Sequence, residues 1–167
     1  DLVGAIDMGG DNPIRIQSMT TTNTNDTDAC VAQAEDIIKT GGELVRLTTQ
    51  GSKEAENLKN INAKLRADGY TTPLVADVHF NPNVADVAAL YAEKVRINPG
   101  NYVDPARKFI KQEYTDEEYA QEIQKIRDRF IPFLNTCKEN HTAIRIGVNH
   151  GSLSDRIMSR YGDTPEG

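Results

Sequence analysis

The sequence predicts an α/β fold, an incomplete (β/α)8 barrel of the TIM type with about five parallel strands after an N-terminal hairpin. Short apolar segments alternate with segments of helical periodicity, which is typical of right-handed βαβ units. No Gly-x-Gly-x-x-Gly or Walker sequence supports the alternative, a doubly wound nucleotide-binding sheet. The 167 residues are too few for eight strand–helix units, which take roughly 250, so we expect one domain, residues 1–167, forming the N-terminal part of a barrel.

The N-terminal half contains a regular series of expected elements. Residues 2–8 and 14–19 flank the turn formers at 9–13 and are expected to pair as a hairpin, and the second of these segments also counts as the first parallel strand. The elements expected next are a helix capped at 25–27 and ended by Gly41-Gly42, a strand at 43–49, a helix from Ser52 to a stop at Gly69, a strand at 73–80, a helix at 84–92 after Asn81-Pro82, and a strand at 94–98.

The C-terminal part begins with a longer connection. Thr115 and Glu118 then have the spacing of a capping box, and they open a helix that Pro132 should kink or split. The last strand is expected at 143–149. Ser152 or Ser154 should cap a short final helix that ends near Gly162.

Composition excludes several classes of function. The formal net charge of −6 argues against nucleic acid or an anionic membrane as a partner. No apolar run is long enough to span a membrane, and the first residues show neither an initiator Met nor a signal pattern, as expected of a trimmed chain. Cys30 and Cys137 form no Cys-x-x-Cys pair, so we expect reduced thiols, no zinc site and a cytoplasmic location.

Three of the predicted strands place an arginine between aliphatic residues: Arg46, Arg96 and Arg145. Because side chains alternate across a strand, the aliphatic neighbours should pack outward under helices and the arginines should point inward, at the same strand depth. Guanidinium groups stay charged and are costly to bury unpaired. Since Asp77 is the one obvious inward acid, a ligand carrying phosphate or diphosphate best explains the remaining positive charge.

Polar residues near the carboxyl ends of these strands extend the candidate site. Alternation sends Asp77, His79, Asn98 and Asn149 to the inner face, at the end where barrel enzymes bind substrate. Two interpretations of Asp77 and His79 stay open at this point. Asp77 is either only a salt-bridge partner or part of a ligand site, and His79 either bonds its own loop or donates a proton or binds a metal.

Four strings in this order closely resemble the N-terminal barrel of the 4-hydroxy-3-methylbut-2-enyl diphosphate synthases: 13–20, 74–80, 95–101 and 144–153. The stretches 114–118 and 149–156 resemble the longer form of this family. The resemblance implies an oxidoreductase of the non-mevalonate isoprenoid pathway. It converts 2-C-methyl-D-erythritol 2,4-cyclodiphosphate reductively into 4-hydroxy-3-methylbut-2-enyl diphosphate, with electrons from flavodoxin or ferredoxin passing through a [4Fe-4S] cluster. Mapped onto this chain, the substrate-binding residues are Arg46, Asp77, His79, Arg96, Asn98, Arg145, Asn149 and Ser152.

One departure from the family is large. The family holds its cluster with three cysteines and a glutamate in a C-terminal domain, and neither Cys30 nor Cys137 matches a ligand motif. We therefore expect a fragment that binds no cluster, contains no residue certain to be catalytic, and cannot turn over substrate alone.

Two other functions remain as alternatives. One is a pterin-binding barrel of the dihydropteroate synthase kind, which also uses inward Asp and Asn beside an anion site. The other is a non-catalytic anion-binding or assembly module, a homo-oligomer in which the open strand edges of neighbouring copies pair.

Overall fold

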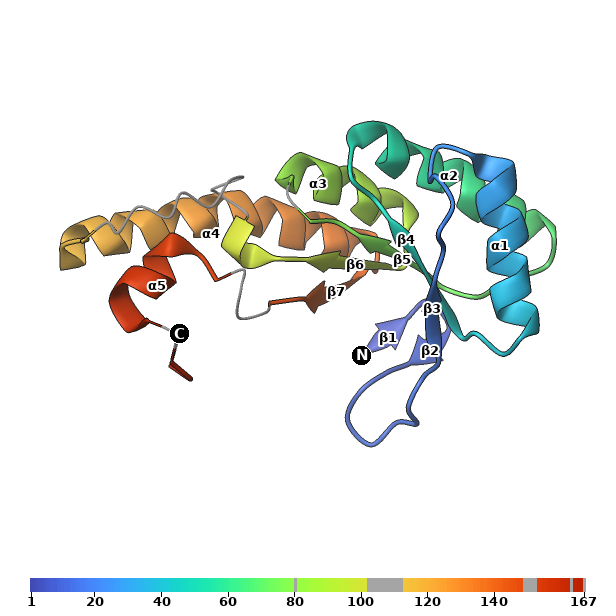
Figure 1. Cartoon of the computed structure of the whole chain (residues 1–167), viewed down its shortest axis with the longest axis horizontal. Coiled ribbons are helices and arrows are strands. Elements are labelled where there is room, and N and C mark those ends of the chain that lie inside the picture. Colours follow the sequence, from blue (N-terminus) through green and yellow to red (C-terminus); the bar gives the residue numbers. More distant parts are fainter. Residues whose placement is uncertain (80, 102–112, 149–152, 163, 167) are drawn as a thin grey trace.

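The computed structural model describes residues 1–79, 81–101, 113–148, 153–162 and 164–166. Five parallel strands form one sheet in the order β3-β4-β5-β6-β7 (Figure 1). Each strand therefore lies next to the strand that follows it in sequence, as in a barrel, whereas a doubly wound sheet reverses direction part-way. The incomplete-barrel prediction is confirmed. The strands are β3 (Gln17–Met19), β4 (Leu44–Thr48), β5 (Leu74–Asp77), β6 (Lys94–Ile97) and β7 (Ala143–Ile146).

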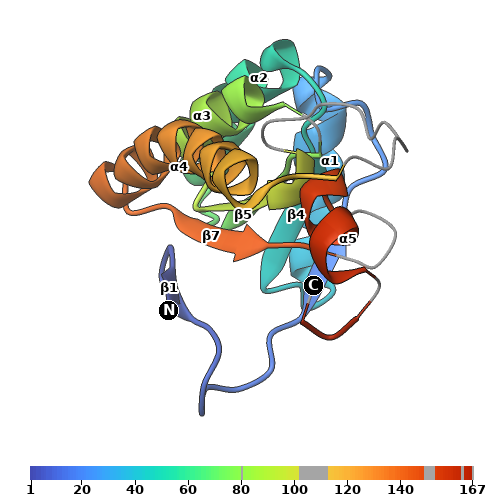
Figure 2. The ribbon, with the colours of Figure 1, turned by 90° about the vertical axis from the view of Figure 1, so that its left-hand side faces the viewer.

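Four helices cover one face of this sheet, and a turn of 3-10 helix, Pro99–Asn101, follows β6 (Figures 1 and 2). The outward side chains of the strands, such as Leu47, Ala76 and Val95, are fully buried against these helices. A short fifth helix lies against the beginning of the fourth, where Arg156 donates from Nε to Glu122 Oε2 at 2.8 Å. The helices are α1 (Thr27–Lys39), α2 (Ser52–Ala67), α3 (Pro82–Tyr91), α4 (Asp116–Glu139) and α5 (Asp155–Tyr161).

The helix starts follow the capping residues in the sequence. Asp26 caps α1 by accepting from the Ala29 N–H, and Asn81 caps α3 with Pro82 at the first helical position. The capping box of Thr115 and Glu118 is present at α4. The cap of α5 is Ser154, one of the two serines expected there. The other, Ser152, lies outside the described residues.

Pro132 does not split its helix. The helix α4 runs unbroken from Asp116 to Glu139, with Pro132 in its interior. Phe133 and Cys137, one and five residues later, are almost fully buried against the rest of the core. This burial holds the C-terminal half of α4 in line despite the missing N–H of the proline.

The N-terminal hairpin exists, but it is formed by other strands than expected. Its strands are β1 (Leu2–Val3) and β2 (Ile6–Asp7), which pair antiparallel around Gly4 at a φ of 57°. The expected pairing of residues 2–8 with 14–19 is wrong, because β3 instead pairs parallel with β4. Val3 packs on Leu44 and Val75 on the face of the sheet opposite the helices, so the hairpin closes the N-terminal end of that inner face.

Two glutamates fasten the beginnings of neighbouring strands by the same arrangement. Just before β4, Glu43 accepts from the backbone N–H of Ile16 and from Arg15 Nη1, both at 2.9 Å. Just before β6, Glu93 accepts from the Leu74 N–H and from Arg66 Nη2, both at 2.8 Å. Each carboxylate thereby satisfies a backbone donor at the start of the preceding strand and helps to set the strand register.

This arrangement predicts a pH dependence of stability. The Ile16 N–H, and after it the Arg15 guanidinium, lower the pKa of Glu43 below its ordinary value of 4.5. A carboxyl whose pKa is depressed by folding stabilises the fold above its unfolded pKa, and that contribution disappears as the pH falls through the folded value. We expect Glu43→Gln to destabilise the pairing of β3 with β4 at neutral pH and to have a smaller effect as the pH drops below 4.5.

Hydrogen exchange of β3 and β4 amides in the complete protein, compared between wild type and variant across this pH range, is the measurement. Glu35→Gln is the control, because Glu35 lies on α1, where it meets Lys39 at 3.9 Å, and it is not one of the groups that bond Ile16 or Arg15. An effect of Glu43→Gln that does not change with pH would contradict the assignment.

Candidate functional site

The strand register places the candidate residues on the inner face in two levels. Thr48, Asp77, Arg96 and Arg145 are aligned across β4 to β7. Arg46 is aligned with Val75, one level closer to the N-terminal end, so the expectation that the three arginines share one depth is wrong. The side chain of Arg46 extends upward and reaches the level of Asp77.

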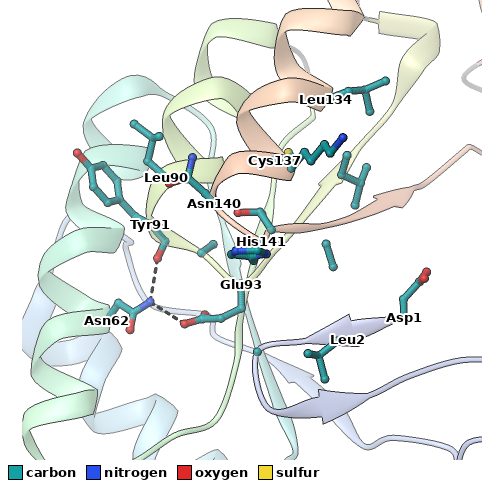
Figure 3. A pocket seen from close by; sticks show the side chains of 16 residues that line it. Asp1, Leu2, Asn62, Leu90, Tyr91, Glu93, Leu134, Cys137, Asn140 and His141 are labelled. Carbon is teal, nitrogen blue, oxygen red and sulfur yellow. Dashed lines mark hydrogen bonds between the residues drawn. The ribbon is translucent and has the colours of Figure 1, made fainter.

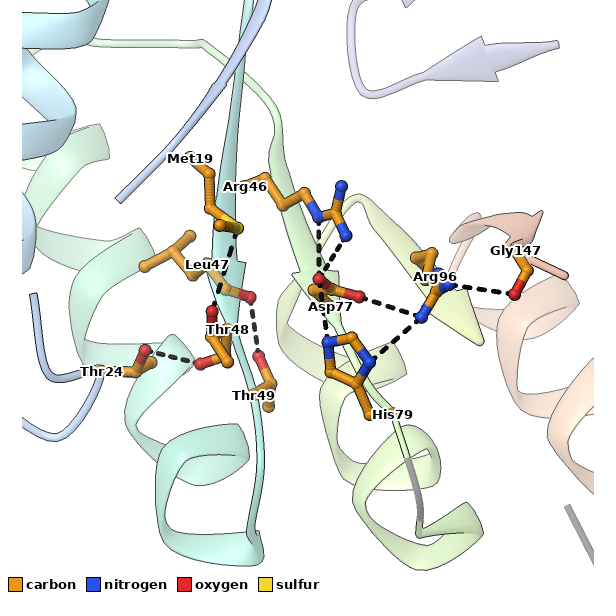
Figure 4. A network of polar contacts seen from close by, with 10 residues as sticks. All are labelled: Met19, Thr24, Arg46, Leu47, Thr48, Thr49, Asp77, His79, Arg96 and Gly147. Atoms are coloured by element: carbon orange, nitrogen blue, oxygen red, sulfur yellow. Dashed lines mark hydrogen bonds and ion pairs between the residues drawn. The ribbon is translucent and has the colours of Figure 1, made fainter. Parts of the chain in front are cut away.

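Asp77 is the centre of a polar cluster and is only 2% exposed (Figure 4). Arg46 donates from Nε to its Oδ2 at 2.9 Å, and Arg46 Nη2 donates to the same oxygen. The Arg96 Nη1 atom lies 3.5 Å from Asp77 Oδ1. One carboxylate therefore serves two guanidinium groups, and its Oδ1 accepts no hydrogen bond within the described part of the chain.

His79 connects the same two partners. Its Nε2 lies 3.2 Å from Asp77 Oδ2, and its Nδ1 lies 3.3 Å from Arg96 Nη1. A guanidinium only donates, so Nδ1 accepts and the ring proton sits on Nε2, where it points at the carboxylate. His79 thereby bridges Asp77 and Arg96 and orients the Arg96 guanidinium.

Arg96 is held from both sides. Its Nη2 donates to the Gly147 carbonyl at 3.0 Å, while Asp77 and His79 occupy the side of Nη1. The side chain is only 14% exposed. A planar donor fixed in this way suits two-point recognition of phosphate oxygens.

The inner face carries more positive than negative charge. Lys94, two residues before Arg96 on the same face, is 8% exposed and donates to Met8 Sδ at 3.1 Å. Burial, and then the charge of Arg145, lower the pKa of Lys94. Arg145 lies in register with Arg96 on the edge strand β7, and its side chain is exposed. Among the described residues, only Asp77 opposes these cations, which favours an anionic ligand.

The structure places the other predicted residues as follows. Asn98 comes directly after β6, is 6% exposed, and accepts from the Gly100 N–H at 3.0 Å, so it shapes its own turn. Asn149 and Ser152 lie outside the described residues. The structure thus brings together Arg46, Asp77, His79 and Arg96, with Arg145 beside them.

Sequence reasoning missed two contributors to this site. Lys94 could have been found from its spacing of two from Arg96, which puts both on one face. No pattern in the sequence marks the Gly147 carbonyl as the acceptor for Arg96, because that contact depends on how β6 and β7 are aligned.

A cavity of about 790 Å³ lies at the opposite end of the strands, between the hairpin, α3 and α4 (Figure 3). Its described lining includes the acidic Asp1 and Glu93 and the basic Lys138, and the lining side chains of Leu90 and Leu134 are exposed. This mixture does not favour an anion. Catalysis in parallel barrels occurs at the carboxyl ends of strands, so the Asp77 cluster remains the better candidate.

The two cysteines do not fit an iron–sulfur cluster. Cys30 in α1 and Cys137 in α4 are free and buried in the helical layer, and Cys30 Sγ donates to the Asn23 carbonyl. Burial raises the pKa of both thiols, that of Cys137 to about 11. Within the described ranges, no three His, Cys, Asp or Glu residues are grouped to hold a metal, and no helix is long and apolar enough to cross a membrane.

Comparison with known proteins gives a consistent result. Residues 2–167 match the family described as the GcpE TIM-barrel domain. Curated relatives called 4-hydroxy-3-methylbut-2-en-1-yl diphosphate synthase (flavodoxin) include those of Bacteroides thetaiotaomicron, Phocaeicola vulgatus and Leptospira interrogans, which are 80%, 81% and 51% identical over 165 residues. Each match covers 99% of this chain, but the chain spans only 27%, 27% and 25% of the length of these relatives.

Proposed function

Because this chain belongs to the GcpE TIM-barrel domain family, we propose that it is the N-terminal, substrate-binding part of a 4-hydroxy-3-methylbut-2-enyl diphosphate synthase. In this proposal the complete enzyme reductively opens 2-C-methyl-D-erythritol 2,4-cyclodiphosphate in the non-mevalonate isoprenoid pathway. The observation that carries the proposal is the excess of positive charge around Asp77, where one buried carboxylate faces Arg46 and Arg96 together. A diphosphate supplies the anionic charge that this inner face lacks.

The contribution of this chain is to bind and orient the substrate. Arg96, Arg46 and Arg145 neutralise the phosphates, and Asp77 and His79 hold the Arg96 guanidinium in one orientation. The family resemblance adds Asn98, Asn149 and Ser152 to the proposed substrate-binding residues. Fixed donors of this kind lower the barrier by positioning the reacting bond and by electrostatic preorganisation.

The redox part of the reaction belongs to residues outside this chain. A [4Fe-4S] cluster would supply the electrons, and the buried, separated Cys30 and Cys137 offer it no ligand set. Flavodoxin is the proposed electron donor, because the names of the relatives include it, and ferredoxin is the alternative. A cytoplasmic location is part of the same proposal, since both thiols are free.

Arg96→Lys in the complete enzyme tests the proposal. Lysine keeps the charge but loses the planar pair of donors, so the Kd for the cyclic diphosphate should rise on the order of tenfold or more. The absorbance spectrum of the cluster should stay unchanged, because this site holds no cluster ligand. Calorimetry measures the Kd, and a pterin pyrophosphate should give no binding heat.

Arg129→Lys is the matched control, because Arg129 pairs with Asp86 on the outer helices. It should bind the cyclic diphosphate as tightly as wild type does. Unchanged affinity and turnover in Arg96→Lys would refute the proposed site.

A further inference from the structure

Gly147 lies directly against the Arg96 guanidinium. A Cβ atom added at Gly147 would stand 2.1 Å from Arg96 Nε and 2.7 Å from Cζ. Both distances are far below van der Waals contact. The position therefore has no space for any side chain while Arg96 keeps its orientation.

The backbone does not explain why this residue is glycine. The φ of Gly147 is not positive, so the residue does not need the left-handed conformation that favours glycine. Its N–H donates to the Ile97 carbonyl at 2.8 Å, and alanine could make the same hydrogen bond. The three atoms nearest to an added Cβ all belong to the Arg96 side chain, so the tightest steric demand comes from Arg96.

The contact also supplies a hydrogen bond to the site. The Gly147 carbonyl accepts from Arg96 Nη2 at 3.0 Å, opposite the side where Asp77 and His79 meet Nη1 (Figure 4). Because Arg96 is only 14% exposed, a displaced guanidinium has little free space. A methyl group at Gly147 would push it away from at least one of these partners.

We propose that Gly147 is a positioning residue for substrate binding: its missing side chain and its carbonyl fix the direction in which Arg96 presents its donors. This inference rests on the proposed function, since it assumes that Arg96 binds the diphosphate. It goes beyond that function because it assigns a role to Gly147, which directly follows β7 and affects substrate binding only through Arg96.

A double-mutant cycle in the complete enzyme tests the inference. We expect Gly147→Ala to raise the Kd and KM for 2-C-methyl-D-erythritol 2,4-cyclodiphosphate on the order of tenfold, with a smaller change in kcat. In an Arg96→Lys background the same change should add less than about twofold, because no guanidinium then lies over Gly147. Should Gly147→Ala accumulate poorly, Arg96→Lys in the same chain should restore it.

Gly51→Ala is the matched control. Its φ is −140°, and the neighbour that an added Cβ meets there among the described residues is the flexible carboxylate of Glu54. It should leave the Kd unchanged.

The outcomes separate the two proposals. If Arg96→Lys itself binds normally, the proposed function is wrong. If Arg96→Lys binds weakly but Gly147→Ala binds like wild type, only the positioning role is wrong. Equal losses from Gly147→Ala in both backgrounds, or a lack of rescue by Arg96→Lys, would show that the glycine serves the backbone and would also overturn the inference.

Discussion

Asp77→Asn should destabilise the centre of the sheet by about 3 kcal/mol, at the low end of the range for breaking a buried ion pair. The variant has nearly the same shape but no charge, so Arg46 and Arg96 would stay in the interior without a counter-ion. Arg46 is 25% exposed, and partial access to water limits the loss. The amide would also turn a donor group toward guanidinium groups that only donate.

Hydrogen exchange of β4, β5 and β6 amides in the complete protein, without substrate, is the measurement. Asp28→Asn makes the same chemical change at an ion pair on the surface, where Asp28 is 84% and Lys64 48% exposed. That control should leave exchange unchanged. Equal protection in Asp77→Asn and wild type would mean that the two arginines need no carboxylate, and the charge argument for the site would then fail.

Phe133→Ala should cost about 3–5 kcal/mol, as is typical when a buried aromatic ring is removed. Phe133 is 0% exposed and is the largest fully buried side chain among the described residues. Its ring lies 6.0 Å from that of Phe130, and it anchors the half of α4 that follows Pro132. The resulting cavity should loosen α4 from α3 and leave the proline without compensation.

Exchange protection of α3 and α4 amides in the complete protein checks this result. Asn135→Ala, at an exposed position of the same helix, should leave protection at the wild-type level. If Phe133→Ala lost protection only after Pro132, α4 would consist of two units that open separately, contrary to the single helix described above.

The sequence predicted the order and direction of the strands because each βαβ unit is a local pattern. The outward packing of Leu74, Ala76 and Val78 followed from alternation alone and is confirmed by their burial in the helical core. The hairpin was misplaced because turn formers at 9–13 mark a bend but do not decide which segment pairs with which. The partner of β3 is chosen by the long-range contact with β4.

The sequence predicted which residue types form the site, but not the height of each side chain along the strands. Alternation placed Asp77 and Arg96 on the inner face, and the structure shows them 3.5 Å apart. The relative height of Arg46 depends on the stagger between β4 and β5, which no single strand encodes. The contact of Gly147 with Arg96 could not be predicted either, because it depends on the alignment of β6 with β7.

The packing of Val3 on Leu44 and Val75 also limits how a ligand can reach the inner face of the sheet. A charged metabolite approaching Asp77 from the amino ends of β4 and β5 would have to displace this apolar packing and lose hydration as it did so. If the proposed function is right, we expect substrate and product to pass at the carboxyl ends of the strands. If this chain acts as we propose, the product must leave the site before the next substrate molecule can bind. The product should therefore inhibit competitively against substrate.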